Sequence, residues 1–175
     1  MAGFQLWVNL AAQDKMQPPA YRDVPPDQVP QYTLAGGVSG VSGDAHVRVI
    51  AGHSHGVAGA VTRPITEPLF LDLTLPAGAS FAQPLPAAHN AFLYVFGGEV
   101  LVHGETVGSE RMAILSTEAG ADGVTLTALD AGARVLLMAG QPLNEPIVQH
   151  GPFVMNTADE IRQAVADFQR GVLAV

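Results

Sequence analysis

Two histidines, His53 and His55, stand two residues apart in the segment AGHSHGVAG at residues 51–59. Neutral imidazole is the commonest protein ligand for transition metals, and residues i and i+2 of a β-strand point to the same face. If the preceding strand, residues 46–51, continued through this pair, both rings would point inward and could bind one metal ion. The three glycines around the pair instead indicate that the strand ends at Ala51 and that the rings diverge on a turn.

His89 is the third candidate metal ligand of the chain. A catalytic metal site commonly uses three protein ligands, and only His89 and His103 are available to join the first pair. No carboxylate stands at a spacing that suggests a further ligand. His89 begins a strand, where it either lines the mouth of a barrel or, in the interpretation that we prefer, hydrogen-bonds to the backbone near the rim. We therefore expect no metal ion and no other cofactor in this chain.

The composition excludes several classes of function. The chain has 175 residues, of which 48% are hydrophobic and 14% charged, and this suits one compact core. A net charge of −8, with eight scattered Lys and Arg residues, offers no basic surface for direct nucleic-acid binding. There is no cysteine for a disulfide or a thiolate site, and no apolar run long enough to span a membrane. These features favour a cytoplasmic protein.

The order of elements follows from the distribution of glycine, proline and apolar runs. Residues 3–10, GFQLWVNL, favour a strand, and the proline-rich residues up to 44 favour an extended connector. From residue 45 onward, short apolar runs alternate with Gly, Pro or Asp turns, which predicts a sandwich or a barrel. The runs are HVRVIA, PLFLDLTL, AFLYVF, EVLVHG, RMAILS, GVTLTAL and ARVLLMAG.

Three details of this β region can be predicted. Leucine at every second position of residues 69–75 predicts a strand that buries one face. The pair Gly97–Gly98 in VFGGEV predicts a two-residue hairpin turn, because glycine adopts positive φ angles without strain. Phe92, Tyr94 and Phe96 share one face of their strand and could line a ligand cavity, but we interpret this row as core packing.

The C-terminal region predicts one amphipathic helix over residues 157–170. Thr157 and Glu160 have the spacing of a capping box, and apolar residues at helical spacing follow them on one face. Gly171 is positioned to end the helix. We therefore divide the chain into an N-terminal strand and connector at residues 1–44 and one domain at residues 45–175, which includes the helix.

Five stretches of the sequence carry a resemblance to a known family. They are GFQLWVNL, DKMQPPAYRDVP, HNAFLYVFGGEV, AGQPLNEPIVQHGPFVMNT and EIRQAVADFQRG. They resemble pirin, a two-domain member of the cupin superfamily, and the match runs from the first residues to the last. The resemblance implies the C-terminal cupin half of a pirin, preceded by the strand and connector that join the halves. The implied fold is all-β: a cupin-type β-barrel, or jelly-roll sandwich, with an extended N-terminal arm and one C-terminal α-helix.

The metal site of that family has no counterpart in this sequence. Pirins resemble iron-dependent dioxygenases because their N-terminal half binds one iron through a His-Pro-His pair and a later His-x-Glu pair. Aligning PLPAAHNAFLYV with that metal-bearing strand places Pro84 and Pro86 where the first two histidines would stand, and proline has no ligand atom. The later strand ARVLLMAGQ offers neither His nor Glu. The resemblance also implies that the metal-bearing half precedes these residues in a full pirin.

Two functions from different classes remain. We favour a metal-free, non-catalytic binding or structural module that acts through its surface, with a protein partner, or with a separate metal-bearing pirin half. The alternative is an iron-dependent quercetin 2,3-dioxygenase-like enzyme, in a longer protein, in trans with such a half, or through a site of His53, His55 and His89. Because the N-terminal strand would leave Trp7 and its apolar neighbours on an unpaired edge, we also predict a homodimer or an exchanged N-terminal arm.

Overall fold

The computed structural model describes residues 3–35 and 43–173, and it divides the chain into two compact units. The larger unit comprises residues 24–142. The smaller unit combines residues 1–23 with residues 143–175. The chain thus returns, at its C-terminal end, to the unit in which it begins. No helix in the described ranges is long and apolar enough to cross a membrane.

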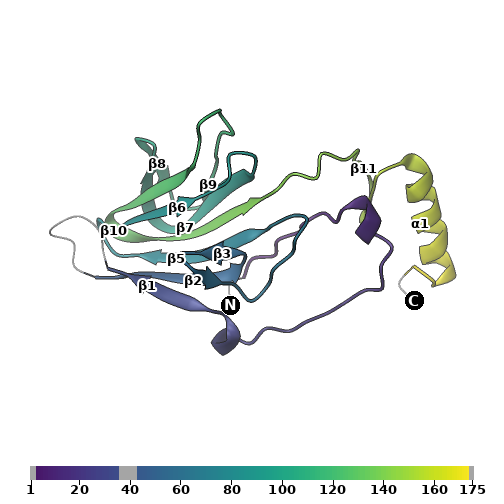
Figure 1. Ribbon diagram of the computed structural model, residues 1–175, viewed down its shortest axis with the longest axis horizontal. Helices are drawn as coiled ribbons and strands as arrows, with labels where there is room; N and C mark the ends of the chain where they lie inside the picture. Colours follow the sequence, from purple (N-terminus) through teal and green to yellow (C-terminus); the bar gives the residue numbers. More distant parts are fainter. Residues whose placement is uncertain (1–2, 36–42, 174–175) are drawn as a thin grey trace. The chain divides into compact units, whose positions relative to one another are not determined.

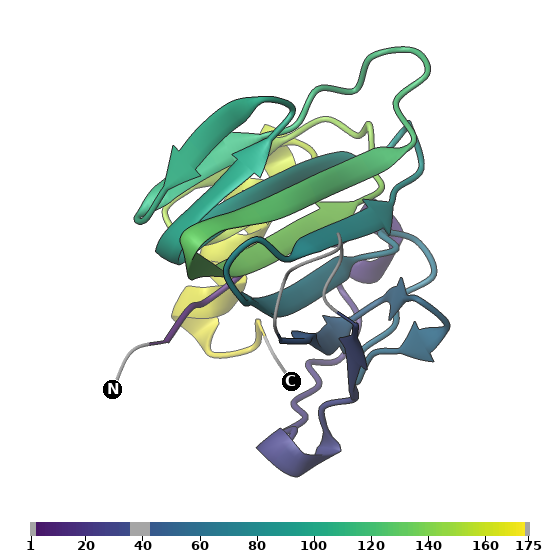
Figure 2. The ribbon, with the colours of Figure 1, turned by 90° about the vertical axis from the view of Figure 1, so that its left-hand side faces the viewer.

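The larger unit is built on one antiparallel sheet of eight strands (Figures 1 and 2). The order along the sheet is β1-β2-β5-β10-β7-β8, while β6 pairs with β10 and β9 pairs with β7. The strands are β1 (Gln31–Leu34), β2 (Ala45–Ala51), β5 (Leu69–Leu75), β6 (Ser80–Pro84), β7 (Asn90–Val102), β8 (Glu105–Gly108), β9 (Arg111–Ile114) and β10 (Gly123–Gly140). The hairpin of β3 (His53–Ser54) and β4 (Val57–Ala58) and a short 3-10 helix at Pro26–Gln28 complete the unit. The prediction of an all-β body is confirmed.

The two longest strands, β7 and β10, each pair with different strands along their length. The first part of β7 pairs with β9, and its last part pairs with β8. The first part of β10 pairs with β6, and its last part pairs with β5. Between these two parts, the pairing of β10 with β7 changes register. Gly98 and Gly132, with φ angles of 67° and 72°, lie where this pairing changes register. A Cβ atom on Gly98 would overlap the carbonyl oxygen of Gly132. The hairpin predicted at Gly97–Gly98 is therefore wrong, because β7 continues through this pair. Gly98 instead allows the backbone of β7 to approach that of β10 closely. The turn comes later, at His103–Gly104, where both φ angles are positive.

The core lies on one face of these strands. The leucines at alternate positions of β5 are buried as predicted, and Phe81, Leu93 and Leu137 pack in the same cluster. Each fully buried side chain of this size contributes about 1.5–3 kcal/mol. The aromatic row of β7, at positions 92, 94 and 96, is half-buried on the opposite face, so its interpretation as core packing is wrong.

The N-terminal segments differ from their predicted structure in two ways. Residues 3–10 form no strand with any described residue, so the strand predicted there is wrong. A β-prone segment becomes a strand only when a partner strand completes its hydrogen-bond ladder. Conversely, β1 (Gln31–Leu34) lies within the predicted connector, where it pairs with β2. Its signal in the sequence is the short β-prone run Tyr32–Leu34 after the last proline of the connector.

The smaller unit joins the two ends of the chain. The backbone N–H of Ala12, in a 3-10 helix at Ala12–Asp14, donates to Glu145 Oε2 at 2.8 Å. Lys15 Nζ donates to the carbonyl oxygen of Val154 at 3.0 Å. The C-terminal part forms the hairpin of β11 (Val148–His150) and β12 (Phe153–Met155), followed by helix α1 (Ala158–Arg170), seen beside β11 in Figure 1.

Helix α1 ends at the predicted residue and begins one residue after the predicted start, because Thr157 is its N-cap. Thr157 Oγ1 accepts a hydrogen bond from the backbone N–H of Glu160 at 3.2 Å, and the Glu160 carboxylate accepts one from the N–H of Thr157 at 2.8 Å. This reciprocal pair is the predicted capping box. Gly171, with a φ of 72°, caps the C-terminal end in the left-handed conformation.

Candidate ligand-binding cavity

A cavity of about 480 Å³ in the larger unit brings together two of the three candidate histidines. His53 and His89 both line it, so we call it the His53–His89 cavity. Four prolines and two leucines form the apolar part of its wall, and five ionisable or amide side chains join them. The lining residues are Gly52, His53, Thr62, Arg63, Pro64, Glu67, Pro68, Leu69, Gln83, Pro84, Leu85, Pro86 and His89.

Gly52 positions His53 at this cavity. With a φ of 82°, Gly52 ends β2, and its backbone N–H donates to the carbonyl oxygen of Val61 at 2.9 Å. A Cβ atom on this glycine would lie 2.5 Å from the carbonyl oxygen of Pro68. Glycine is therefore needed here both for the left-handed backbone and for the close approach of the opposite wall. The prediction that strand geometry ends at Ala51 is confirmed.

His89 faces a carboxylate across the same cavity. Its Nε2 lies 3.4 Å from Glu67 Oε2, and only 8% of the His89 side chain is exposed, against 54% for Glu67. The N–H of Glu67 donates to the carbonyl oxygen of Arg63 at 3.1 Å, so one turn carries both a carboxylate and a guanidinium to the cavity. The structure thus places the His89 side chain at the cavity wall, while its backbone N–H donates to Pro86 at 3.0 Å.

A buried polar network lies behind one wall. Ser54 and Gln83 are 2% and 6% exposed, and Ser54 Oγ donates to Gln83 Oε1 at 2.5 Å. Tyr32 Oη lies 2.6 Å from Ser54 Oγ and 2.9 Å from His55 Nδ1. Burial raises the pKa of the Tyr32 hydroxyl.

The three candidate histidines do not form one site. His55 has a φ of 47°, and its ring packs against those of Tyr32 and Phe81, with both pairs of ring centroids 5.5 Å apart. His53 instead lines the cavity, so the two rings of the pair have different surroundings. Within residues 3–35 and 43–173, no three His, Asp or Glu side chains lie close enough to hold a metal ion. These residues do not fit the three-ligand iron site of a catalytic centre.

Several residues of this region were not identified from the sequence. Arg63 and Glu67 lie in a connection without a recognisable motif. Gln83 carried a usable signal, because it occupies an inward position two residues after Phe81 on β6, where the alternation calls for an apolar residue. Ser54 is a buried polar partner that appears only once the hairpin of β3 and β4 is folded.

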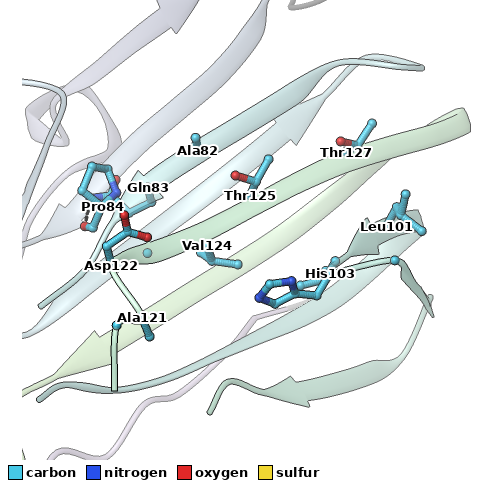
Figure 3. A pocket seen from close by; sticks show the side chains of 14 residues that line it. Ala82, Gln83, Pro84, Leu101, His103, Ala121, Asp122, Val124, Thr125 and Thr127 are labelled. Carbon is cyan, nitrogen blue, oxygen red and sulfur yellow. Dashed lines mark hydrogen bonds between the residues drawn. The ribbon is translucent and has the colours of Figure 1, made fainter. Parts of the chain in front are cut away.

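A second, larger cavity of about 740 Å³ lies over the other face of β6 and β10 (Figure 3). Ala82, Thr125 and Thr127 project toward it from these strands, and His103 and Asp122 are its ionisable side chains. Figure 3 also shows Gln83 bound to the backbone of Pro84, the two residues that this cavity shares with the His53–His89 cavity. Because fewer polar side chains converge on the larger cavity, the His53–His89 cavity is the stronger candidate site.

Comparisons with known proteins agree on one family. The family model of the Pirin C-terminal cupin domain matches residues 70–174. A Pseudomonas aeruginosa protein whose name refers to quercetin 2,3-dioxygenase is 50% identical over 182 residues, covering 100% of this chain and 60% of that protein. A pirin-like protein of Caulobacter vibrioides is 41% identical over 172 residues, covering 98% of this chain and 58% of that protein.

A solved structure supports the same fold. The crystal structure of quercetin 2,3-dioxygenase from Acinetobacter baumannii is similar with a TM-score of 0.81 and 35% identity. The match covers 95% of this chain and 55% of that one. The chain therefore spans between 55% and 60% of the length of these three proteins.

Proposed function

Because the chain belongs to the pirin family and corresponds to its C-terminal cupin half, we propose that it acts as a metal-free, non-catalytic binding module. The His53–His89 cavity is its binding site for a small molecule. The observation that carries this proposal is the lining of the cavity. Pro84 and Pro86, at the positions where the family's iron ligands would stand, line it together with a few polar side chains.

The form of the cavity supports ligand binding. Its volume of about 480 Å³ lies in the range of small-molecule sites, which are mostly apolar with a few directed polar groups. His89 and Gln83 supply such groups from well-buried positions. His55, which a metal site would need beside His53, is engaged by Tyr32 instead.

Elemental analysis of tag-free protein is the first test. We expect no stoichiometric iron, zinc, nickel, copper or manganese, and no difference between the wild type and a His53→Ala/His55→Ala variant. Near-stoichiometric metal that disappears in the double variant would overturn the metal-free proposal. Ligand-detected NMR against a fragment set then tests the cavity: His89→Ala should abolish binding that His150→Ala, a substitution in the smaller unit, leaves intact.

A second candidate function is favoured by the names of the relatives. Two of the three proteins compared above refer to quercetin 2,3-dioxygenase, and this chain spans 60% and 55% of their lengths. An iron-dependent quercetin 2,3-dioxygenase-like activity would then belong to a longer protein or to an assembly with a separate metal-bearing half. Quercetin oxidation in the presence of iron should be undetectable with this chain alone. Oxidation that requires His53, His55 and His89 would place the activity in this chain.

We further propose that the N-terminal segment mediates association between two copies in the cytoplasm, or with a separate pirin half or another protein partner. Trp7 and Val8, in residues 3–10, where no strand forms, are 73% and 52% exposed. Exposed apolar side chains on a backbone without a ladder favour pairing with another chain. Sedimentation at micromolar concentration should show a dimer, which Trp7→Ser weakens and Tyr21→Ser leaves unchanged. A monomer alone would contradict self-association.

A further inference from the structure

We propose that the His53–His89 cavity selects a ligand in which a carboxylate is attached to a flat apolar ring system. This inference rests on the proposed function, because it names the class of ligand that the same site would bind. It follows from three properties of the cavity: the direction of the hydrogen bonds behind its wall, the charges at its rim and the shape of its apolar lining.

The direction of the network begins with Gln83. Its Nε2 donates to the carbonyl oxygen of Pro84 at 2.9 Å, so the other amide atom, Oε1, is the one that faces Ser54. Oε1 can only accept, and Ser54 therefore uses its single hydroxyl proton to donate to it. Ser54 Oγ remains an acceptor for its other neighbours.

The donors of the other two hydrogen bonds in the network can be assigned in the same way. Tyr32 Oη lies 2.6 Å from Ser54 Oγ, and since the Ser54 proton is already used, Tyr32 must donate. The Tyr32 proton is then used as well, so His55 Nδ1, 2.9 Å away, must carry a proton and donate to Tyr32 Oη. The donors thus run in one direction from His55 through Tyr32 and Ser54 to Gln83.

This direction determines what Gln83 offers to a ligand. An amide nitrogen has two N–H groups, and one of those on Gln83 is used by Pro84. The second N–H has no other acceptor among the residues that the structure describes, on a side chain that lines the cavity and is 6% exposed. A buried donor of this kind favours a ligand atom that accepts a hydrogen bond.

The charges at the rim favour an anion. The Glu67 carboxylate faces His89, whose Nε2 lies 3.4 Å from Glu67 Oε2, so His89 occupies the position beside this carboxylate. Arg63 is exposed and lines the same cavity, as does His53. Because a guanidinium binds a carboxylate through two parallel hydrogen bonds, a carboxylate satisfies Arg63 better than a neutral acceptor does.

The apolar lining favours a flat ring. Four prolines, at positions 64, 68, 84 and 86, contribute rigid ring faces, and Leu69 and Leu85 complete the apolar wall. Rigid walls lose little conformational entropy when a planar molecule packs between them. The volume of about 480 Å³ accommodates a fused two-ring acid such as 2-naphthoate.

Calorimetric titration of the 175-residue chain with 2-naphthoate and with its neutral counterpart 2-naphthamide tests the proposal. The acid should bind about tenfold more tightly than the amide, since hydrogen bonds to charged groups exceed neutral ones by roughly this factor. Arg63→Gln, an exposed substitution, should remove this preference. Arg111→Gln, the same change of charge on β9, should leave it intact. Equal affinity for both probes, unchanged in Arg63→Gln, would overturn the inference.

NMR of the Gln83 side-chain amide tests the positioning role of Ser54. The amide resonances should shift when 2-naphthoate binds to the wild type. In Ser54→Ala the amide loses the donor that fixes its orientation, so we expect its two proton resonances to move and the affinity to fall several-fold. Gln83→Glu, which places a carboxylate at the donor, should abolish binding of the acid. Unchanged amide resonances in Ser54→Ala would contradict the directed network.

The outcomes separate this inference from the proposed function. If 2-naphthamide binds as well as 2-naphthoate and His89→Ala weakens both, the cavity is a binding site but not one for acids. If neither probe binds and the amide resonances of Gln83 never respond, both proposals are wrong.

Discussion

Tyr32 and Ser54 tie the first strand of the sheet to the hairpin of β3 and β4, with Oη and Oγ 2.6 Å apart across 22 residues of sequence. Removing the hydroxyl in Tyr32→Phe leaves Ser54 without its donor in a buried position. We expect a loss of about 1–2 kcal/mol in the free energy of unfolding. Denaturant titration measures this loss, and Tyr21→Phe, at a side chain that is 92% exposed, is the matched control. Equal effects of the two substitutions would contradict a role for the network.

The same tyrosine predicts an alkaline limit of stability. Burial raises the pKa of Tyr32 above its ordinary value of 10.0, so the folded state holds this proton more tightly than the unfolded state. Its contribution is fully present below pH 10.0 and is lost as the pH rises through the folded pKa. The melting temperature should therefore fall more steeply above pH 10 in the wild type than in Tyr32→Phe. Parallel curves would show that another group is responsible.

Substitutions at Gly98 and Gly104 together test the close approach between β7 and β10. Both have positive φ angles, of 67° and 84°, so alanine at either position is strained by about 1 kcal/mol. At Gly104 a Cβ atom has nothing within 4 Å, whereas at Gly98 it overlaps the carbonyl of Gly132. We expect Gly98→Ala to cost about 1–3 kcal/mol more than Gly104→Ala in unfolding experiments. Similar costs would mean that the two backbones can separate easily.

The capping box of α1 predicts a local effect in the smaller unit. Thr157→Ala removes the acceptor for the N–H of Glu160 and should destabilise the helix by about 0.5–2 kcal/mol. Amide hydrogen exchange in the first turn of α1 measures this local opening. Thr157→Ser, which keeps the acceptor, should exchange like the wild type, and faster exchange in both variants would point away from the cap.

Acid should weaken the same capping box by protonating the Glu160 carboxylate. Hydrogen bonds from the backbone of Thr157 and Asn156 lower the pKa of the Glu160 carboxyl below its ordinary value of 4.5. A lowered folded-state pKa means that the stabilisation is present above pH 4.5 and is lost as the pH falls through the folded pKa. Exchange in the first turn should therefore accelerate below this pH in the wild type, while Glu160→Gln should show a flatter pH profile.

Local patterns predicted the elements whose determinants are close in sequence. The helix follows from Thr157, Glu160 and Gly171, and the buried face of β5 follows from its alternating leucines. The glycine pair at 97–98 was misread because its role depends on Gly132, which a distant strand brings beside it. The same limit applies to the cavity, since Gln83 acquires its partner Ser54 from a hairpin that is distant in the sequence.

The family resemblance predicted the architecture but not the details of the site. The prediction that Pro84 and Pro86 supply no iron ligand follows from residue type alone, because proline lacks a ligand atom in any conformation. The contact of His89 with Glu67 could not be foreseen, because it depends on how two connections meet at one end of the sheet. Features of the site that depend on residue type can be predicted from the sequence. Contacts between two loops that are distant in the sequence cannot.

The hydrogen bond from Ala12 to Glu145 spans 133 residues and has a consequence for synthesis on the ribosome. Residues 24–142 emerge as one uninterrupted stretch, so the sheet can form while translation continues. The smaller unit must wait, because its first half leaves the exit tunnel long before its second half has been polymerised. During that interval Trp7 and its apolar neighbours lack the C-terminal half of their unit. Until residues 143–173 have been synthesised, residues 3–10 should therefore be available to chaperones.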